Sequence, residues 1–259
     1  MQRRDDGPRL RGGDGFGRVA VGVPYWKGCG PFFQWWSLLL VGGFEDDDEL
    51  LIRPDVPVEV PIPMAHNAIV RAFLTTEADT LCMIEDDHVA DQEVVRRMRT
   101  KPANLEFDIV CASYVNRRGT PLPMGWFFGD GQGRILEPGE PLPANRRGYQ
   151  CCFDLPAVRL SGTQAYDGAA AGLVLIRRWV LEEILAQDDA ALEHCLWFEW
   201  KGESSQDVDF YAKARAVGAR VGVDRDNWVG HVGTKVWTRD DFVQWRDGSK
   251  GGGGPEAAY

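Results

Sequence analysis

The stretch TLCMIEDDHVA, residues 80–90, decides how this chain is read. An apolar run from Leu81 to Ile84 ends abruptly in Glu85, Asp86 and Asp87. Such a run is typical of a strand buried on both faces. Neighbouring carboxylates repel one another and resist burial, so their position predicts a cation beside them. The alternative is a solvated acidic turn that caps the next helix.

Working outward, apolar strands alternate with helical patterns. Strands are predicted at 18–26, 80–85, 107–115, 171–178 and 219–233, a short extended piece at 58–63, and helices at 31–42, 65–77, 91–101, from 179 to about 187, and at 204–218. This alternation predicts an α/β fold with a mostly parallel central sheet and helices on both faces. Ligands bind beyond the carboxyl ends of strands in such sheets, which is where the acid cluster falls.

The chain's length and composition suit one domain. With 259 residues and 44% hydrophobic content, it can bury a single core. We expect one domain at 18–247, between a flexible segment at 1–17 and a flexible Gly-rich tail at 248–259. No apolar run approaches the ~18 residues of a membrane span, and no secretory signal is seen.

The net charge and the cysteines narrow the class of protein to which the chain can belong. The net charge of −10 disfavours a duplex-DNA binder, although Arg-rich pieces at 3–18, 117–118 and 146–147 leave a local basic patch open. The six cysteines form no C-x-x-C pair, so reduced thiols and a cytoplasmic location are expected.

Two further segments carry candidate chemistry. In NWVGHVG, residues 227–233, glycines lie on both sides of His231. They would allow the histidine to approach a metal ion closely. The alternative is an ordinary loop histidine. In ESSQDVDFYAKARAVG, residues 203–218, Asp207 lies in the first turn of a capped helix. The helix dipole alone explains an acid there; the functional interpretation is a general base.

Taken in order, these segments resemble the GT-A glycosyltransferases, in particular the family-2-like bacterial and phage members, over roughly residues 18–235. The resemblance is carried by RVAVGVP (18–24), AHNAIVRAFLTTEADTLCMIEDDHV (65–89), FDIVCASYVNRRGTPLP (107–123), YDGAAAGLVLIRRWVLEEI (166–184) and WFEWKGESSQDVDFYAKARAVGARVGVDRDNWVGHVG (197–233). These match that family's nucleotide-binding strand, arginine–asparagine helix with D-x-D motif, basic loop, acceptor-side segment, and closing acidic helix with its histidine.

The resemblance implies a single Rossmann-like GT-A domain and a metal-dependent, hexosyltransferase-like enzyme. It would move a sugar from a nucleotide-diphosphate donor, UDP- or GDP-sugar, to an acceptor hydroxyl. Mn²⁺ or Mg²⁺ would be held by Asp87 and His231, and would neutralise the diphosphate. Asp207 would be the base. The acceptor (glycan, protein or modified nucleic acid) and the stereochemistry stay open.

Further site residues follow from the same resemblance. Donor-binding candidates are Pro24, Tyr25, His66, Asn67, Glu85, Asp86, Arg117 and Arg118; acceptor-side candidates are Asp167, Gly168, Trp197 and Trp200. Core packing is the alternative for the tryptophans, a turn for Asp167, and a solvated basic loop for the arginines. The chain departs from the family at three positions, with Glu85 for the first aspartate, His66 for the arginine and Gln206 for a glutamate.

Those departures keep two other functions open. One is a non-catalytic nucleotide- or sugar-binding module of the same fold. The other is a metal-dependent nucleotidyltransferase or phosphoesterase, although GVPYWKGCGP, residues 22–31, is not a convincing phosphate loop.

Overall fold

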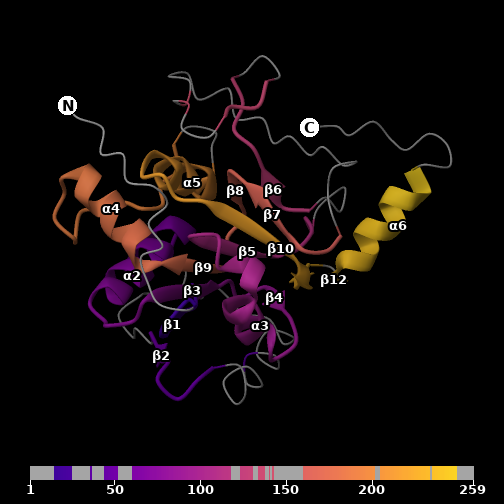
Figure 1. Cartoon of the computed structure of the whole chain (residues 1–259), viewed down its shortest axis with the longest axis horizontal. Helices are drawn as coiled ribbons and strands as arrows, with labels where there is room; N and C mark the ends of the chain where they lie inside the picture. Colours follow the sequence, from indigo (N-terminus) through magenta and orange to yellow (C-terminus); the bar gives the residue numbers. More distant parts are fainter. Residues whose placement is uncertain are drawn as a thin grey trace.

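A seven-stranded sheet forms the centre of the molecule (Figure 1). The computed structural model describes residues 15–24, 36, 44–51, 60–117, 123–130, 134–137, 140, 142, 160–201, 205–233 and 235–249. The strands, in spatial order, are β2 (Glu49–Leu50), β1 (Val19–Gly22), β3 (Thr80–Ile84), β9 (Leu173–Arg177), β5 (Ile109–Ser113), β10 (Val221–Trp228) and β7 (Thr163–Tyr166).

The α/β class is confirmed, and the sheet is mixed. β1 pairs in parallel with β2 and β3, and β5 with β10. β9 lies antiparallel between β3 and β5, and β7 antiparallel to β10. β1, β2, β3, β5 and β10 therefore run in one direction, as expected of a mostly parallel sheet, and β9 and β7 run against them. β9 is buried nearly throughout, like its parallel neighbours, so its apolar run carries no information on direction.

Helices cover both faces of the sheet. They are α2 (Ile62–Leu74), α3 (Val94–Thr100), α4 (Arg178–Asp188), α5 (Gln206–Ala216) and α6 (Arg239–Ser249), with a 3₁₀ turn at Pro102–Asn104. Figure 1 shows α2, α4 and α5 on one side of the central strands and α3 on the other. The four predicted helices from residue 65 onward are confirmed, with shifted ends.

One predicted segment is wrong at its end, and another lies beyond what the structure describes. The extended piece at 58–63 gives way to α2 at Ile62, because Pro63 in the first turn needs no intrahelical N–H partner. The helix predicted at 31–42 falls outside the described residues except for Trp36.

The core is built from both sheet faces. Strand residues such as Leu81, Met83 and Val174 are fully buried, and Phe16, ahead of β1, belongs to the same core. Cys82, Cys111 and Cys195 are buried free thiols; Cys29, Cys151 and Cys152 lie outside the described residues. Within the described ranges, no helix is long and apolar enough to cross a bilayer.

Two small sheets extend the central one. β4 (His88–Val89) pairs antiparallel with β11 (Gly230–Val232), which also pairs with β12 (Val236–Trp237). β6 (Gly125–Trp126) pairs antiparallel with β8 (Gly168–Ala169). The first of these sheets joins the chain after β3 to the chain after β10.

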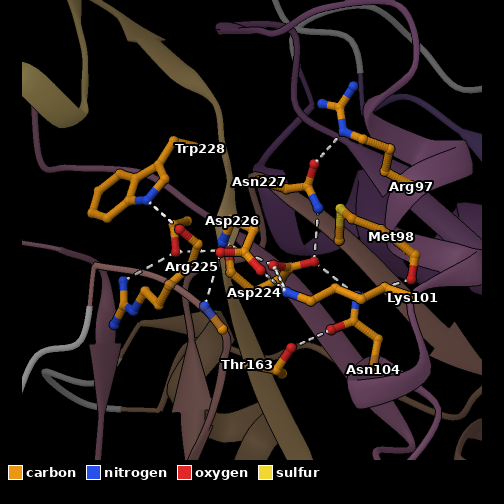
Figure 2. A network of polar contacts seen from close by, with 12 residues as sticks. Arg97, Met98, Lys101, Asn104, Thr163, Asp224, Arg225, Asp226, Asn227 and Trp228 are labelled. Carbon is orange, nitrogen blue, oxygen red and sulfur yellow. Dashed lines mark hydrogen bonds and ion pairs between the residues drawn. The ribbon is translucent and has the colours of Figure 1, made fainter.

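A buried polar network ties α3 to β10 (Figure 2). Asp224 is fully buried and accepts hydrogen bonds from Lys101 Nζ at 2.6 Å and from the amides of Asn104 and Asn227 at 2.8 Å each. Asn227 in turn accepts a hydrogen bond from Arg97 Nε at 2.8 Å. The network fixes the irregular part of β10 that leads to β11.

Asp224→Ala is expected to lower the free energy of unfolding by about 3 kcal/mol, because it removes the buried carboxylate that accepts from Lys101 and from two amides. Asp226→Ala is the matched control. Asp226 also pairs with Lys101, at 2.6 Å, but its side chain is 46% exposed, so a loss below ~1 kcal/mol is expected. Urea unfolding of both variants measures the difference; equal losses would contradict this role for Asp224.

Candidate functional site

The candidate site lies where β3, β5 and β10 end and β9 begins. β3, β5 and β10 point the same way, so their carboxyl ends share one edge of the sheet, and antiparallel β9 starts at that edge. The Glu85 N–H donates to the carbonyl of Gly172 just before β9, at 2.9 Å. Segments far apart in the sequence thereby meet around the acid cluster.

Asp87, His88 and His231 form a group able to hold a metal ion. One ligand atom from each residue lies within 4.8 Å of the others. His88 and His231 are direct cross-strand partners of β4 and β11, and their rings stack at 4.5 Å. Asp87 Oδ1 lies 2.8 Å from His88 Nδ1, and Oδ2 lies 3.6 Å from His231 Nε2. The predicted pair, Asp87 and His231, is thus together, with His88 as a third donor.

The hydrogen bond of His231 decides which of its ring nitrogens faces Asp87. Its Nδ1 lies 3.0 Å from the carbonyl oxygen of Val115. A carbonyl only accepts, so Nδ1 carries a proton, and Nε2 is the nitrogen that faces the Asp87 carboxylate. Nε2 is therefore the atom that His231 could offer to an ion held by Asp87.

Asp87 and His88 favour the protonation states in which they can bind a metal ion. Burial opposes ionisation of Asp87, but its contacts with His231 and His88 outweigh this and hold the carboxyl pKa well below its usual value. Burial lowers the pKa of His88, and Asp87 only partly offsets this. His88 therefore favours the neutral imidazole that binds metals.

Arg117 lies against the same carboxylate. Its guanidinium pairs with Asp87 Oδ2 and donates to the carbonyl of Val232 at 3.0 Å. Arg117 thus links the end of β5 to β11 and supplies positive charge beside the metal group. Arg118, the other predicted phosphate contact, lies outside the described residues.

The Glu85 carboxyl lies between the imidazoles of His66 and His88. Its carboxyl oxygens lie 3.7 Å from His66 Nε2 and 3.9 Å from His88 Nδ1. Burial, followed by the charges of Asp207 and Asp87, raises the Glu85 pKa well above its usual value. Asp86, next along the chain, is half-buried.

His66 and Asn67 of α2 have different surroundings. His66 is fully buried, with its ring edge-on to Phe198 at 4.7 Å and neither ring nitrogen hydrogen-bonded. Burial lowers its pKa to about 4, so it is neutral near pH 7 and brings no charge to a diphosphate. Asn67 uses its amide on the Phe198 backbone, through bonds of 2.7 and 3.0 Å.

Asp207 enters the site from the first turn of α5. It is only 8% exposed, and its Oδ1 has no hydrogen-bond partner. Burial raises its pKa to about 7, and a hydrogen bond from the Ala171 backbone partly offsets that rise. Its charge acts on Glu85 and on Tyr114, which places it on the same cluster. A carboxylate that titrates near neutrality and has one oxygen without a hydrogen-bond partner is suited to general-base work.

Two of the four acceptor-side candidates, Trp197 and Asp167, are held by contacts within the protein. Trp197 is fully buried and donates from Nε1 to the carbonyl of Leu181 at 2.9 Å, so it belongs to the core. Asp167 accepts from the Phe128 N–H at 2.8 Å and pairs with Arg215.

The other two acceptor-side candidates, Gly168 and Trp200, have different surroundings from Trp197 and Asp167. A Cβ at Gly168 would lie 2.6 Å from Trp126 Nε1, so packing explains this glycine. Trp200 is 56% exposed. On the donor side, Pro24 is buried just after β1, and Tyr25 lies outside the described residues.

Three site residues were missed by sequence reasoning. His88 directly follows the acids, and only the β4–β11 register shows that it faces His231. Buried Tyr114 packs edge-on against His88 at 4.4 Å and His231 at 5.3 Å. A Cβ at Gly172 would lie 2.3 Å from His88 Nε2. The adjacent His in EDDH was an available signal; the other two had none.

No protein-family model matches the chain, and no curated protein does either. Among solved structures, it is similar to A197 from STIV, with a TM-score of 0.46 and 15% identity, over 83% of this chain and 85% of that one. It is also similar to S. aureus TarS 1–349, with a TM-score of 0.46 and 13% identity, over 81% of this chain and 58% of that one. The same fragment in complex with UDP-GlcNAc gives 0.45 and 13%, over 81% and 56%.

Proposed function

We propose that this protein is a metal-dependent glycosyltransferase of GT-A type that uses a nucleotide-diphosphate sugar. The observation that carries the proposal is a juxtaposition: Asp87 of the Asp87–His88–His231 group and the buried carboxyl of Asp207, whose pKa is about 7, both act on Glu85. A cation site next to a base is what transfer to a hydroxyl requires. The order of the sequence motifs supports the same assignment.

The donor set fits a divalent transition ion. One carboxylate and two imidazoles suit Mn²⁺ or a similar ion better than Mg²⁺, which prefers oxygen ligands. Asp87, His88 and His231 would hold the ion, and the bound ion would neutralise the leaving diphosphate as a Lewis acid. Of the two ions expected from the sequence, Mn²⁺ is therefore the one we propose.

The chain's own groups have separable roles. Asp207 would take the proton from the acceptor hydroxyl, a role that belongs to an inverting transfer. Arg117, already beside Asp87, would contribute charge to the phosphates. Glu85, whose pKa is raised by burial and by the charges of Asp207 and Asp87, would hydrogen-bond a donor hydroxyl. Neutral His66 would orient Glu85 rather than contact the diphosphate.

A second candidate is a binding module that holds the donor without turnover. Neutral His66, in place of a permanently charged arginine, is the observation that favours it. It predicts the same nucleotide binding with no sugar released. Assaying donor hydrolysis as well as binding separates the two.

The test is a thermal-shift panel of UDP-, GDP-, dTDP- and CMP-sugars, each with Mn²⁺ or with EDTA. A ligand that binds only the native state raises the melting temperature with its degree of saturation. We expect a shift with one nucleotide that EDTA removes, accompanied by slow Mn²⁺-dependent release of free sugar. No shift with any nucleotide would reject the transferase, and binding without sugar release would select the module.

A further inference from the structure

An exposed indole stands next to the candidate base. Trp200 is 56% exposed, and its Nε1 donates to Gln206 Oε1 at 2.6 Å. Gln206 directly precedes Asp207 at the start of α5. The only polar atom of this side chain is therefore used inside the protein, while much of the ring is open to solvent.

The segment that carries Trp200 is held on both sides. The carbonyl of Cys195 accepts from Arg71 at 3.3 Å, and both backbone polar groups of Phe198 bind Asn67. The Phe198 ring stacks on Phe210 of α5 at 4.5 Å. These contacts anchor the chain to α2 and α5. The position of the exposed indole relative to Asp207 is thus set by the fold.

We propose that Trp200 is the acceptor platform and that the acceptor is a neutral glycan. The apolar face of a pyranose ring would stack on the indole and bring a hydroxyl to Asp207. This inference rests on the proposed function and adds the acceptor class to it. Aromatic side chains with one polar atom satisfied and an open face are suited to such stacking.

The charges around Trp200 favour a neutral ligand. Lys201 Nζ lies 2.9 Å from Glu199 and 3.2 Å from Asp209, so the cation next in the chain to Trp200 is already paired. A nucleic acid would also stack on tryptophan, but its affinity depends on cations that neutralise phosphates. Lys201 offers no such free charge. The side-chain arrangement therefore suits a sugar ring better than a nucleobase.

Gln206 is a positioning residue for this platform. It stands where the resembling family has a glutamate, and its amide oxygen accepts the Trp200 bond without a charge. Gln206 thus holds the indole in place without adding a negative charge next to Asp207.

The experiment uses the full chain and a panel of neutral cello-, malto-, xylo- and chito-oligosaccharides, with an oligonucleotide and a serine-rich peptide as other classes. For the best acceptor, we expect Trp200→Ala to raise KM at least tenfold and Trp200→Phe to restore most of the loss. Gln206→Leu should raise KM with a smaller effect on kcat. In all three variants, the Mn²⁺-dependent thermal shift with donor should stay unchanged.

Binding without donor separates this inference from the transferase assignment. NMR saturation transfer from protein to oligosaccharide should be strong for the wild type and lost in Trp200→Ala. If it is seen although no nucleotide binds, the platform stands and the transferase fails. Donor binding with no oligosaccharide contact, transfer unaffected by Trp200→Ala, or preference for the oligonucleotide or peptide would each overturn the platform.

Discussion

Asp207→Asn is expected to lower the rate of sugar transfer by about 10³-fold while Mn²⁺-dependent donor binding persists. The amide keeps the size of the side chain but cannot take the acceptor proton. Thermal shift with the donor measures binding, and release of nucleoside diphosphate measures turnover. Full activity in this variant would remove Asp207 as the base.

The pH dependence of the wild type provides an independent check. Because burial raises the Asp207 pKa to about 7, the ionised base is depleted below that pH. The rate should fall tenfold per pH unit as the medium becomes more acidic, and level off above pH about 7. The residual rate of Asp207→Asn should lack this step. A wild-type rate that is flat from pH 5 to 8 would contradict a base with this pKa.

Asp207→Asn should also stabilise the fold, by an amount that grows as the pH rises. The folded-state pKa of about 7 exceeds the usual 3.8, so folding favours the protonated acid. That contribution is fully present below pH about 4 and is lost as the pH rises toward 7. In EDTA, the variant should match the wild type near pH 4 and gain on the order of 2–4 kcal/mol near pH 7.5.

Asp209→Asn is the matched control on the same helix. Asp209 is 2% exposed but pairs with Lys201 at 3.2 Å and Lys213 at 2.8 Å. Its neutralisation removes one anionic partner from each of two lysines and should lower the melting temperature. If both variants change stability in the same direction, the difference between a catalytic and a structural acid on α5 is not supported.

The features readable from the sequence are those that depend on local pattern. The apolar run at 80–85 became β3, and the helical spacing at 65–77 became α2 with its start displaced to Ile62. Asp207 and His231 stand in local patterns, a capped helix start and flanking glycines, but their proposed roles were implied only by the family resemblance. Such patterns report burial and period, which act over a few residues.

Features set by distant partners were not readable. Nothing in LVLIR, residues 173–177, distinguishes an antiparallel strand from its parallel neighbours, since the whole segment is covered on both faces. Trp197 and Trp200 are three residues apart, yet one bonds to Leu181 in the core and the other to Gln206 beside the base. Tertiary contacts decide which tryptophan is available to a ligand.

The metal group shows the same limit most clearly. In an extended chain, residues 87 and 88 point to opposite sides, so the sequence pattern did not place His88 with Asp87. The structure instead turns at Glu85, whose carbonyl accepts from the His88 N–H at 3.2 Å. His88 then begins β4 and pairs with His231. A turn of three residues therefore adds a second imidazole, that of His88, to the predicted pair of Asp87 and His231.

His88→Ala is accordingly expected to weaken Mn²⁺ binding by about 100-fold, because it removes one of three protein donors. His66→Ala is the matched control: it deletes an equally buried imidazole that lies by Glu85 but outside the donor group. Its Mn²⁺ affinity should stay within about threefold of the wild type. Titration of free Mn²⁺ by electron paramagnetic resonance reports both constants directly.

Gly172→Ala tests the same assignment without deleting a donor. Its new methyl would stand 2.3 Å from His88 Nε2, so the imidazole must move and Mn²⁺ affinity should fall, although every proposed ligand is still present. Gly125→Ala, where the nearest atoms are at 3.4 Å, should bind Mn²⁺ like the wild type. If His88→Ala and Gly172→Ala both retain full affinity while Asp87→Ala loses it, the ion is held without His88. The preference for Mn²⁺ over Mg²⁺ then loses its basis, because that preference follows from two imidazoles rather than one.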